Sequence, residues 1–426
     1  MSKRTWLLTV SLVIACGLSV SLQNAFAAAP IVIGVPTSTG FLEGKESLKA
    51  VELAVEEINA KGGVSVGGEK RLFSVESIDI RDAAPGVPVP EALLGLEKII
   101  LDKKPAALLV GPFRSEALMA GMDIIAKYKV PLIATIAMSP ASEDKVKEDP
   151  AKYKYIFRTC LNAKYLVKYL AGTMAFINKQ FGFTKVYIMN QDVAWARKTA
   201  EIISEMYFTK TGWTIVGSES YPTGTSDFSS ALMKVRAGEA QVILPIFDMP
   251  QSGTLVKQWN AMKVPAIMAG FISPLAGPGA WKTFDQNIEG AINCNFELGS
   301  AIASAQVPAS EAFLAAYQKK YGSPVEAGHG IAPAYESVYI LAEAIERAGS
   351  VEADAIVAEL EKTDRMGVMG KCKFDAGHQV IYDMDPKETA VAAMLQWTAA
   401  GKRTIVFPSA LAEGLIQLPH GLKSLK

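Results

Sequence analysis

Short apolar runs alternate with amphipathic stretches from residue 31 almost to the end of the chain. The apolar runs have the length of buried strands, and the stretches between them repeat apolar residues at three- and four-residue steps. In residues 46–59 this spacing is followed by Leu48, Val51, Val55 and Ile58. Strands that alternate with helices of this length predict parallel sheets covered by helices on both faces, so the fold class is α/β.

The predicted strands are residues 31–35, 73–80, 107–110, 132–134, 186–189, 242–247 and 266–269. The predicted helices are residues 46–59, 90–101, 116–128, 195–209 and 228–237. About 400 residues exceed what one hydrophobic core normally supports, so two lobes are expected. Further extended runs are placed to form three strands that cross between the lobes: residues 155–160, 290–296 and 371–375.

The first 27 residues have the pattern of a secretory signal peptide. Lys3 and Arg4 precede an apolar stretch, and Ala25-Phe26-Ala27 fits the cleavage site. The apolar stretch is too short for a stable membrane span. An alternative is a lipoprotein anchored through Cys16, because residues 13–16 resemble a lipoprotein cleavage box. Cleavage after residue 27 is the preferred interpretation, since the apolar run continues past Cys16.

Charge and composition exclude several classes of function. The chain has 43 basic and 43 acidic residues, and removal of Lys3 and Arg4 with the signal peptide leaves it slightly acidic. This balance gives no support for binding to nucleic acid or to an anionic membrane. No other hydrophobic run is long enough to span a bilayer.

Export makes the cysteines of interest. Cys160, Cys294 and Cys372 remain after the signal peptide, an odd number for an oxidising compartment. A disulfide between Cys294 and Cys372 is one possibility, and three buried apolar thiols are the other. No Cys/His spacing indicates zinc.

Motifs for catalysis are absent from the sequence. It contains neither an HExxH pair, nor a GxSxG turn, nor a GxxxxGK[ST] phosphate loop, nor a GxGxxG motif. His329, His378 and His420 lie far apart and are interpreted as surface or structural residues. The first strand, loop and helix, residues 31–63, instead present hydroxyls and backbone N–H groups where a parallel sheet usually binds a ligand. No enzyme activity, cofactor or metal is therefore expected.

The whole chain after the signal peptide resembles the periplasmic leucine/isoleucine/valine-binding protein family, the type I solute-binding proteins of ABC transporters. The segments that carry the resemblance, in order, are IGVPTSTG with AVELAVEEINAKGG, VPLIATIAMSP, YIFRTC, YPTGTSDFSSALMKV and AYESVYILAEAIERAG. The resemblance implies two doubly wound parallel-sheet lobes joined by three hinge crossings. It places residues 28–158 and 295–373 in lobe 1, and residues 159–294 and 374–426 in lobe 2.

The same resemblance implies ligand contacts at particular residues. Ser115 matches a side chain that contacts the ligand carboxylate, and Ala137 matches a position whose backbone binds the head group. Trp195 stands where the family commonly has a tyrosine, and Asp248 lies near the family's carboxylate for the ligand ammonium. Each has a structural alternative. Ser115 could cap the following helix, Asp248 could cap the helix after Pro250, and Trp195 could pack on a helix.

The chain departs from the family pattern in two loops, the one that carries Met138 and the one that carries Arg114. Met138 replaces a threonine that contacts the α-amine of leucine-like ligands, and methionine has no donor. The neighbouring Ser139 is a candidate substitute. Arg114 is unusual in its loop, and an inward guanidinium would favour a carboxylate, although such a residue is more often solvated. Phe113 and Phe271, in loops after apolar strands, are further candidates for the ligand site.

The expected function follows from this resemblance. The protein is expected to be a periplasmic, monomeric solute-binding protein that captures a small amino acid or a related carboxylate or amide by hinge closure. Its partner would be an ABC permease in the inner membrane. The alternative is a ligand-sensing module of the same fold for a membrane receptor.

Overall fold

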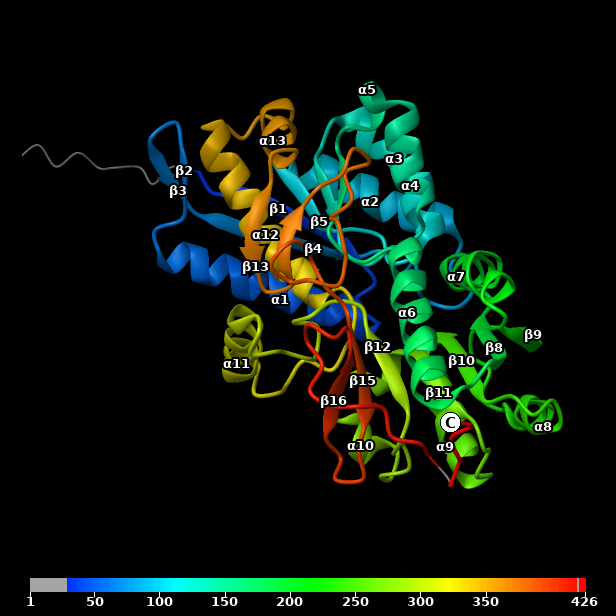
Figure 1. Ribbon diagram of the computed structural model, residues 1–426. Helices are drawn as coiled ribbons and strands as arrows, with labels where there is room; N and C mark the ends of the chain where they lie inside the picture. The colour runs from blue at the N-terminus through cyan, green and yellow to red at the C-terminus, as the bar shows by residue number, and fades with distance from the viewer. Residues whose placement is uncertain (1–28, 420) are drawn as a thin grey trace, which may run out of the picture.

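The structure is a computed structural model that describes residues 29–419 and 421–426. The predicted signal peptide, residues 1–27, and the alternative lipid site Cys16 lie outside the described residues. Two sheets of parallel or mainly parallel strands form two lobes, which are seen one above the other in Figure 1. This confirms the predicted α/β fold of two doubly wound lobes.

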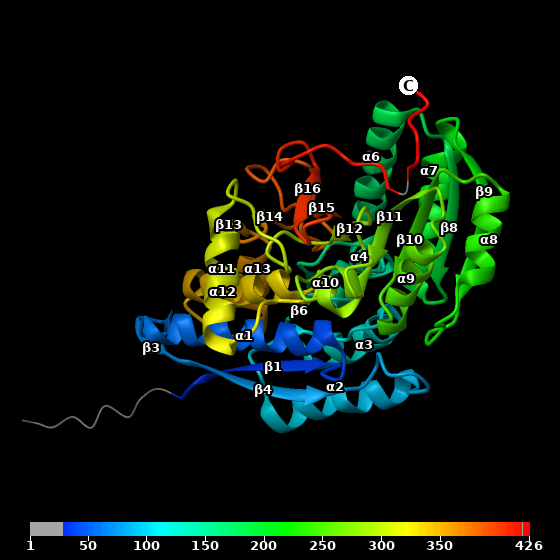
Figure 2. The same ribbon diagram turned by 90° about the horizontal axis from the view of Figure 1, so that it is seen from below.

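The first lobe contains a five-stranded sheet in the order β4-β1-β5-β6-β7, with every pairing parallel. Helices α1 and α12 pack against each other and against β5. Helix α2 packs against β1, β4 and helix α3. Figure 2 shows α1 and α2 on opposite faces of this sheet. The bounds are β1 Ile31–Thr37, β4 Phe73–Asp79, β5 Ala107–Val110, β6 Leu132–Ala134, β7 Ile156–Arg158, α1 Leu42–Ala60, α2 Val89–Lys103, α3 Ser115–Tyr128 and α12 Ile331–Ala348.

The second lobe contains a seven-stranded sheet in the order β16-β15-β12-β11-β10-β8-β9. Strands β8 to β12 pair in parallel, and β15 and β16 add an antiparallel edge next to β12. Helices α6 and α7 contact each other and the sheet, while α8 packs against β9 and α9. The bounds are β8 Lys185–Gln191, β9 Thr214–Tyr221, β10 Val242–Phe247, β11 Ile267–Ile272, β12 Ile292–Asn295, β15 Ala393–Trp397, β16 Arg403–Phe407, α6 Ala163–Phe181, α7 Ala194–Met206, α8 Ser229–Ala237 and α9 Gly253–Ala261.

The chain passes between the lobes three times. It leaves the first sheet after β7, returns after β12 to reach α12, and leaves again after β14 to reach β15. The remaining elements are β2 Val64–Val66, β3 Glu69–Arg71, α4 Ala141–Glu148, α5 Pro150–Tyr153, α10 Ala280–Thr283, α11 Pro308–Tyr321, α13 Ala353–Leu360, β13 Asp364–Gly367, β14 Gly370–Lys373 and three short 3₁₀ helices, η1 Phe208–Lys210, η2 Pro250–Ser252 and η3 Ser273–Leu275.

Of the two alternatives for the cysteines, the structure has the buried free thiols and not the disulfide between Cys294 and Cys372. Cys160, Cys294 and Cys372 are all buried free thiols. Cys294 lies on β12 of the second sheet, whereas Cys372 lies on the β13–β14 hairpin, and both pack in the large apolar core. Burial raises the pKa of each thiol, which keeps it in the uncharged form that suits such a core.

Among the described residues, no helix combines the length and the apolar composition that a membrane crossing needs.

Candidate functional site

A closed cavity lies between the two lobes, which we call the interlobe cavity. Its volume is about 10 Å³, roughly the space of one water molecule. The walls of the site therefore touch one another in this conformation. The residues that line it are Glu43, Phe113, Ile136, Met138, Trp195, Asp248, Phe271, Phe296 and His329.

The strand order of the two sheets explains why these residues meet. In the first sheet β1 lies between β4 and β5, and in the second sheet β8 lies between β10 and β9. In each sheet the chain therefore adds later strands on both sides of the first one, and the strand order reverses there. Ligands of doubly wound folds bind outside the carboxyl ends of strands at such a point. Phe113 follows β5 and Met138 follows β6 in the first lobe, while Trp195 follows β8 and Asp248 follows β10 in the second.

Aromatic rings form most of the second-lobe wall. The rings of Phe271 and Phe296 lie 4.0 Å apart between centroids, and the Trp195 ring meets them edge-on at 5.9 and 6.2 Å. The His329 ring lies 4.8 Å from Phe296 on the other side. The edge-to-face contacts of Trp195 with both phenylalanines, and of His329 with Phe296, are an arrangement that aromatic quadrupoles favour. The rings fill a site that, with the lobes apart, would accept a flat apolar group.

An ion pair joins the lobes at the edge of the cavity. Nη1 of Arg114, in the first lobe, donates to Oδ2 of Asp248, in the second, at 2.6 Å, and both side chains are about nine-tenths buried. The indole Nε1 of Trp195 donates to the same Oδ2 at 2.8 Å. Burial alone would lower the pKa of Arg114, but the charge and hydrogen bond of Asp248, with the charges of Asp82 and Glu116, together raise this pKa above its ordinary value. The guanidinium of Arg114 therefore stays charged.

The second oxygen of Asp248 has a different environment. Oδ1 is buried and has no hydrogen-bond partner among the described residues. Buried carboxylate oxygens are almost always paired, so an unpaired one that borders a cavity is the mark of a group that would accept a bond from a bound molecule. The backbone N–H of Asp248 is already used, because it donates to Oε1 of Gln191 at 3.1 Å.

A second contact between the lobes is carried by Glu43, in the first turn of α1. The hydroxyl of Ser273, in the second lobe, donates to its Oε1. Burial raises the pKa of Glu43 above its ordinary value, against the opposite effect of this hydrogen bond. The uncharged form of Glu43 is thereby favoured at the bottom of the cavity.

His329 connects the cavity wall to the crossing strands. Its Nδ1 lies 3.0 Å from Oε1 of Glu297, and its Nε2 lies 2.7 Å from the carbonyl oxygen of Ile136. Both partners are acceptors, so both ring nitrogens must donate and the ring is protonated. Burial lowers the pKa of His329, but the charge of Glu297 and its hydrogen bond hold it above the ordinary value. Glu297 also accepts from the backbone N–H of Leu161, on the first crossing, at 3.1 Å.

The loop that carries Phe113 and Arg114 is held in an unusual backbone conformation. Val110 has a φ of 69° and is followed by Gly111 at 72°. A positive φ is unfavourable for a β-branched residue and is a strain that often marks functional loops. The carboxylate of Asp82 fixes the loop, because its Oδ2 accepts from the Arg114 N–H at 2.7 Å and its Oδ1 accepts from the hydroxyl of Ser38 at 2.6 Å.

The structure brings most of the sequence-predicted site residues together. Phe113, Met138, Trp195, Asp248 and Phe271 line the interlobe cavity, and Arg114 bonds to one of them. Their ligand contacts stay predictions, but their convergence from five separate loops or strands is now a structural fact.

Three other predicted site residues, Ser115, Ala137 and Ser139, do not line the cavity. The hydroxyl of Ser115 accepts from the backbone N–H of Ser139 at 3.0 Å, and the carbonyl oxygen of Ala137 accepts from Nη1 of Arg158 at 3.1 Å. The capping alternative for Ser115 does not hold, because α3 begins at Ser115 itself, after Arg114. Asp248 likewise caps no helix, since η2 follows Met249.

Sequence reasoning missed Glu43, Ile136, Phe296 and His329. Glu43 lay in the loop before the predicted helix 46–59, and Phe296 lay at the end of a predicted crossing strand. The interpretation of His329 as an isolated surface or structural residue was incomplete, because it also lines the cavity. A signal was present in GHGIAPAYES, where His329 comes just before a long buried helix.

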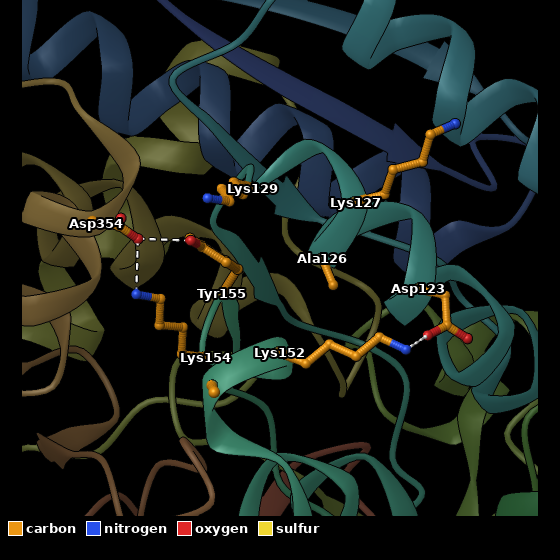
Figure 3. A pocket seen from close by; sticks show the side chains of 9 residues that line it. Asp123, Ala126, Lys127, Lys129, Lys152, Lys154, Tyr155 and Asp354 are labelled. Atoms are coloured by element: carbon orange, nitrogen blue, oxygen red, sulfur yellow. Dashed lines mark hydrogen bonds and ion pairs between the residues drawn. The ribbon is translucent and has the colours of Figure 1, made fainter.

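A larger depression, with a volume of about 540 Å³, lies on the outside of the first lobe (Figure 3). Three of its four lysines have partners: Lys152 pairs with Asp123 at 2.6 Å, Lys154 with Asp354 at 2.9 Å and Lys127 with Glu97 at 3.1 Å. The Tyr155 hydroxyl donates to the same Asp354. These are exposed ion pairs of little energetic weight, so this surface is not a second candidate site.

Within residues 29–419 and 421–426, no group of histidine, cysteine, aspartate and glutamate side chains is arranged to hold a metal ion.

Comparisons with known proteins bear on the whole chain. The model of the periplasmic binding protein family matches residues 32–401. Leu/Ile/Val-binding protein homolog 7 from Brucella suis biovar 1 is 27% identical over 384 residues, which cover 89% of this chain and 91% of that protein. This similarity confirms the resemblance drawn from the sequence.

Solved structures show the same fold. The branched-chain amino acid transporter substrate binding protein LivJ from Streptococcus pneumoniae, in complex with isoleucine, has a TM-score of 0.71 at 24% identity, with 89% of this chain and 100% of that one covered. A solute binding protein from R. palustris, in complex with benzoate, has a TM-score of 0.70 at 17% identity, with 91% and 99% covered. With its two lobes, its three crossings and a family match over residues 32–401, this chain belongs to the periplasmic binding protein family.

Proposed function

We propose that the protein is the extracytoplasmic solute-binding component of a branched-chain-amino-acid-type ABC importer. It captures a small amino acid, or a related carboxylate or amide, by closing its two lobes around it. The observation that carries this proposal is the interlobe cavity, whose walls come from both lobes and from the crossing strands. No bond is made or broken in this function, in agreement with the binding proteins that the chain resembles.

The contacts between the lobes describe what closure consists of. The Arg114–Asp248 pair, the Ser273–Glu43 hydrogen bond and a 3.3 Å bond from the Ala194 N–H to Glu116 all span the two lobes. A cavity of about 10 Å³ cannot admit an amino acid, so binding requires these contacts to part. A ligand that touches both lobes then shifts the equilibrium back toward closure by its differential affinity for the closed state.

Particular residues would hold the ligand. Trp195, Phe271 and Met138 provide apolar contact area, while Asp248 accepts from a donor on the ligand and Arg114 donates to an acceptor. Ser115 and Ala137 act from behind, by fixing the loop that carries Met138. The closed surface of both lobes is what an inner-membrane permease would recognise, and a periplasmic location and a monomeric state are parts of the same proposal.

The test is a thermal-shift screen of the purified chain against aliphatic and aromatic amino acids, aromatic carboxylates, short amides and polyols. Free ligand at about 100 times its Kd stabilises a protein by roughly 2.7 kcal/mol, which is a measurable shift in Tm. Each hit is followed by small-angle scattering with and without ligand. If no solute in the panel raises Tm or changes the scattering profile, the proposed function is wrong.

A further inference from the structure

The ion pair at the cavity edge has unused hydrogen-bonding capacity on both sides. Oδ1 of Asp248 is buried without a partner, and Asp248 is 8% exposed. On the other side, the Arg114 side chain makes one hydrogen bond among the described residues, from Nη1 to Asp248, although a guanidinium carries five N–H donors. When the lobes close again and the pair re-forms, Oδ1 of Asp248 can still accept a hydrogen bond and the Arg114 guanidinium beside it can still donate one.

The charges around the cavity already balance. Arg114 is compensated by Asp248 at 2.6 Å, and the protonated His329 by Glu297 at 3.0 Å. Glu43 is held by Ser273 in a fully buried position that favours its uncharged form. Burying a further net charge here would leave it uncompensated, which is unfavourable. The cavity is therefore matched to a ligand without net charge.

The remaining wall is made of rings. Trp195, Phe271 and Phe296 contact one another at 4.0 to 6.2 Å between centroids, and Phe113 stands opposite in the first lobe. These three rings belong to one wall, so they stay together when the lobes part. A flat aromatic group can add ring contacts to this cluster, whereas an aliphatic side chain adds only apolar area.

We infer that the interlobe cavity selects an aromatic ligand of zero net charge that presents a hydrogen-bond acceptor and a donor side by side, the acceptor toward Arg114 and the donor toward Oδ1 of Asp248. An aromatic primary amide and an aromatic amino-acid zwitterion both have this chemistry. The inference rests on the proposed solute-binding function and names the ligand class of that same cavity.

Calorimetric titration of the full chain without its signal peptide tests this with four probes. Benzamide and L-phenylalanine have the ring and the donor–acceptor pair; benzoate has the ring but a net charge and no donor; L-leucine has the pair without the ring. The better of benzamide and phenylalanine is expected to bind at least tenfold more tightly than benzoate and than leucine. If benzamide binds more tightly than phenylalanine, the ligand is an amide; if phenylalanine binds more tightly, it is an amino acid.

Benzoate or leucine binding within tenfold of that probe overturns the inference. Silence of all four probes overturns it as well. The broad solute screen then separates the two proposals: a hit outside these classes leaves the solute-binding function standing, and no hit in that screen removes both.

Asp248→Asn gives an independent test, because it keeps the shape of the side chain but removes its charge. Arg114 is then uncompensated, so the ratio of the benzoate to the benzamide dissociation constant is expected to fall at least tenfold. Asp285→Asn is the matched control, since Asp285 is an exposed second-lobe aspartate paired with Lys257, and it should leave the ratio unchanged. An unchanged ratio in a folded Asp248→Asn protein, checked by its ligand-free melt, contradicts the inference.

Discussion

At the scale of single residues, the site shows what sequence patterns can and cannot reveal. Trp195 and Asp248 could be named because the sequence resembles a known family at these positions, and both come after apolar strands, where a parallel sheet places its ligand loops. Glu43 gave no local sign of burial, and His329 gave only its position just before a long buried helix. Their burial depends on partners far along the chain, Ser273 and Glu297.

His329 makes the stability of the protein depend on pH. Its pKa is held above the ordinary value of 6.5 by Glu297, while Glu43 faces it with a weaker effect. A group with a raised folded-state pKa contributes stability that is complete below about pH 6.5 and is lost as the pH rises through the folded-state pKa. Urea unfolding from about pH 6 to about pH 9 should therefore show falling stability.

The matched variant for this prediction is His329→Gln, whose amide keeps one donor without titrating. Its free energy of unfolding should be lower near pH 6 and should vary less with pH. If it falls with pH as steeply as that of the parent protein, His329 is not the responsible group.

The three thiols make a second prediction at this scale. Cys160, Cys294 and Cys372 are buried and their pKa values are raised, so the folded protein should not react with a thiol reagent. In denaturant all three should react. A reducing agent should leave Tm unchanged, and a drop in Tm on reduction would contradict the free-thiol state.

At the scale of elements, the strands that are continuous apolar runs were predictable, and several others were not. The runs at residues 107–110, 132–134 and 242–247 coincide with β5, β6 and β10. The edge strand β9 was missed because TIVGSESY alternates and is half-exposed. Strands β15 and β16 were missed because their place in the second sheet depends on a return crossing from the first lobe, which no local pattern encodes.

Strand β7 carries the side chain that ties several elements together. The buried Arg158 donates to the carbonyl oxygen of Ser139 at 2.7 Å, to Oε1 of Gln379 at 2.5 Å and to Glu143 on α4. Its backbone also forms a bridge with Gln379. The guanidinium of Arg158, on the first crossing, therefore links the loop beside Met138 to the third crossing.

Removing this guanidinium should be strongly destabilising. Arg158→Met leaves Glu143 buried without its cation, so a loss of roughly 3–5 kcal/mol in the free energy of unfolding is expected. Adding Glu143→Gln to that variant should restore part of the loss, because the uncompensated charge is gone. A loss below about 1 kcal/mol in denaturant unfolding, the range of an exposed pair, would show that the network carries little energy.

At the scale of the whole molecule, the two lobes are in contact around the interlobe cavity. The Arg114–Asp248 pair is the buried ionic part of that contact. Arg114→Ala should therefore shift the ligand-free protein toward the open form, with at least a tenfold rise in the open-to-closed ratio, or about 1.4 kcal/mol. Small-angle scattering would show this as a larger radius of gyration.

The control is Arg197→Ala, which removes an exposed ion pair between Arg197 and Asp192, both in the second lobe. Exposed pairs contribute little, so its scattering profile should match that of the parent protein. If Arg114→Ala also matches the parent profile, the ion pair does not hold the lobes together.

The order of strands in the second sheet has a consequence for biosynthesis. Strands β15 and β16 reach that sheet from residues 393–407, after the chain has returned through the first lobe. The sheet's antiparallel edge cannot form until a ribosome has made the chain through residue 407. Such late, long-range pairing slows folding. For the export that the proposed function requires, this delay would be an advantage, because a finished core would block a secretion channel.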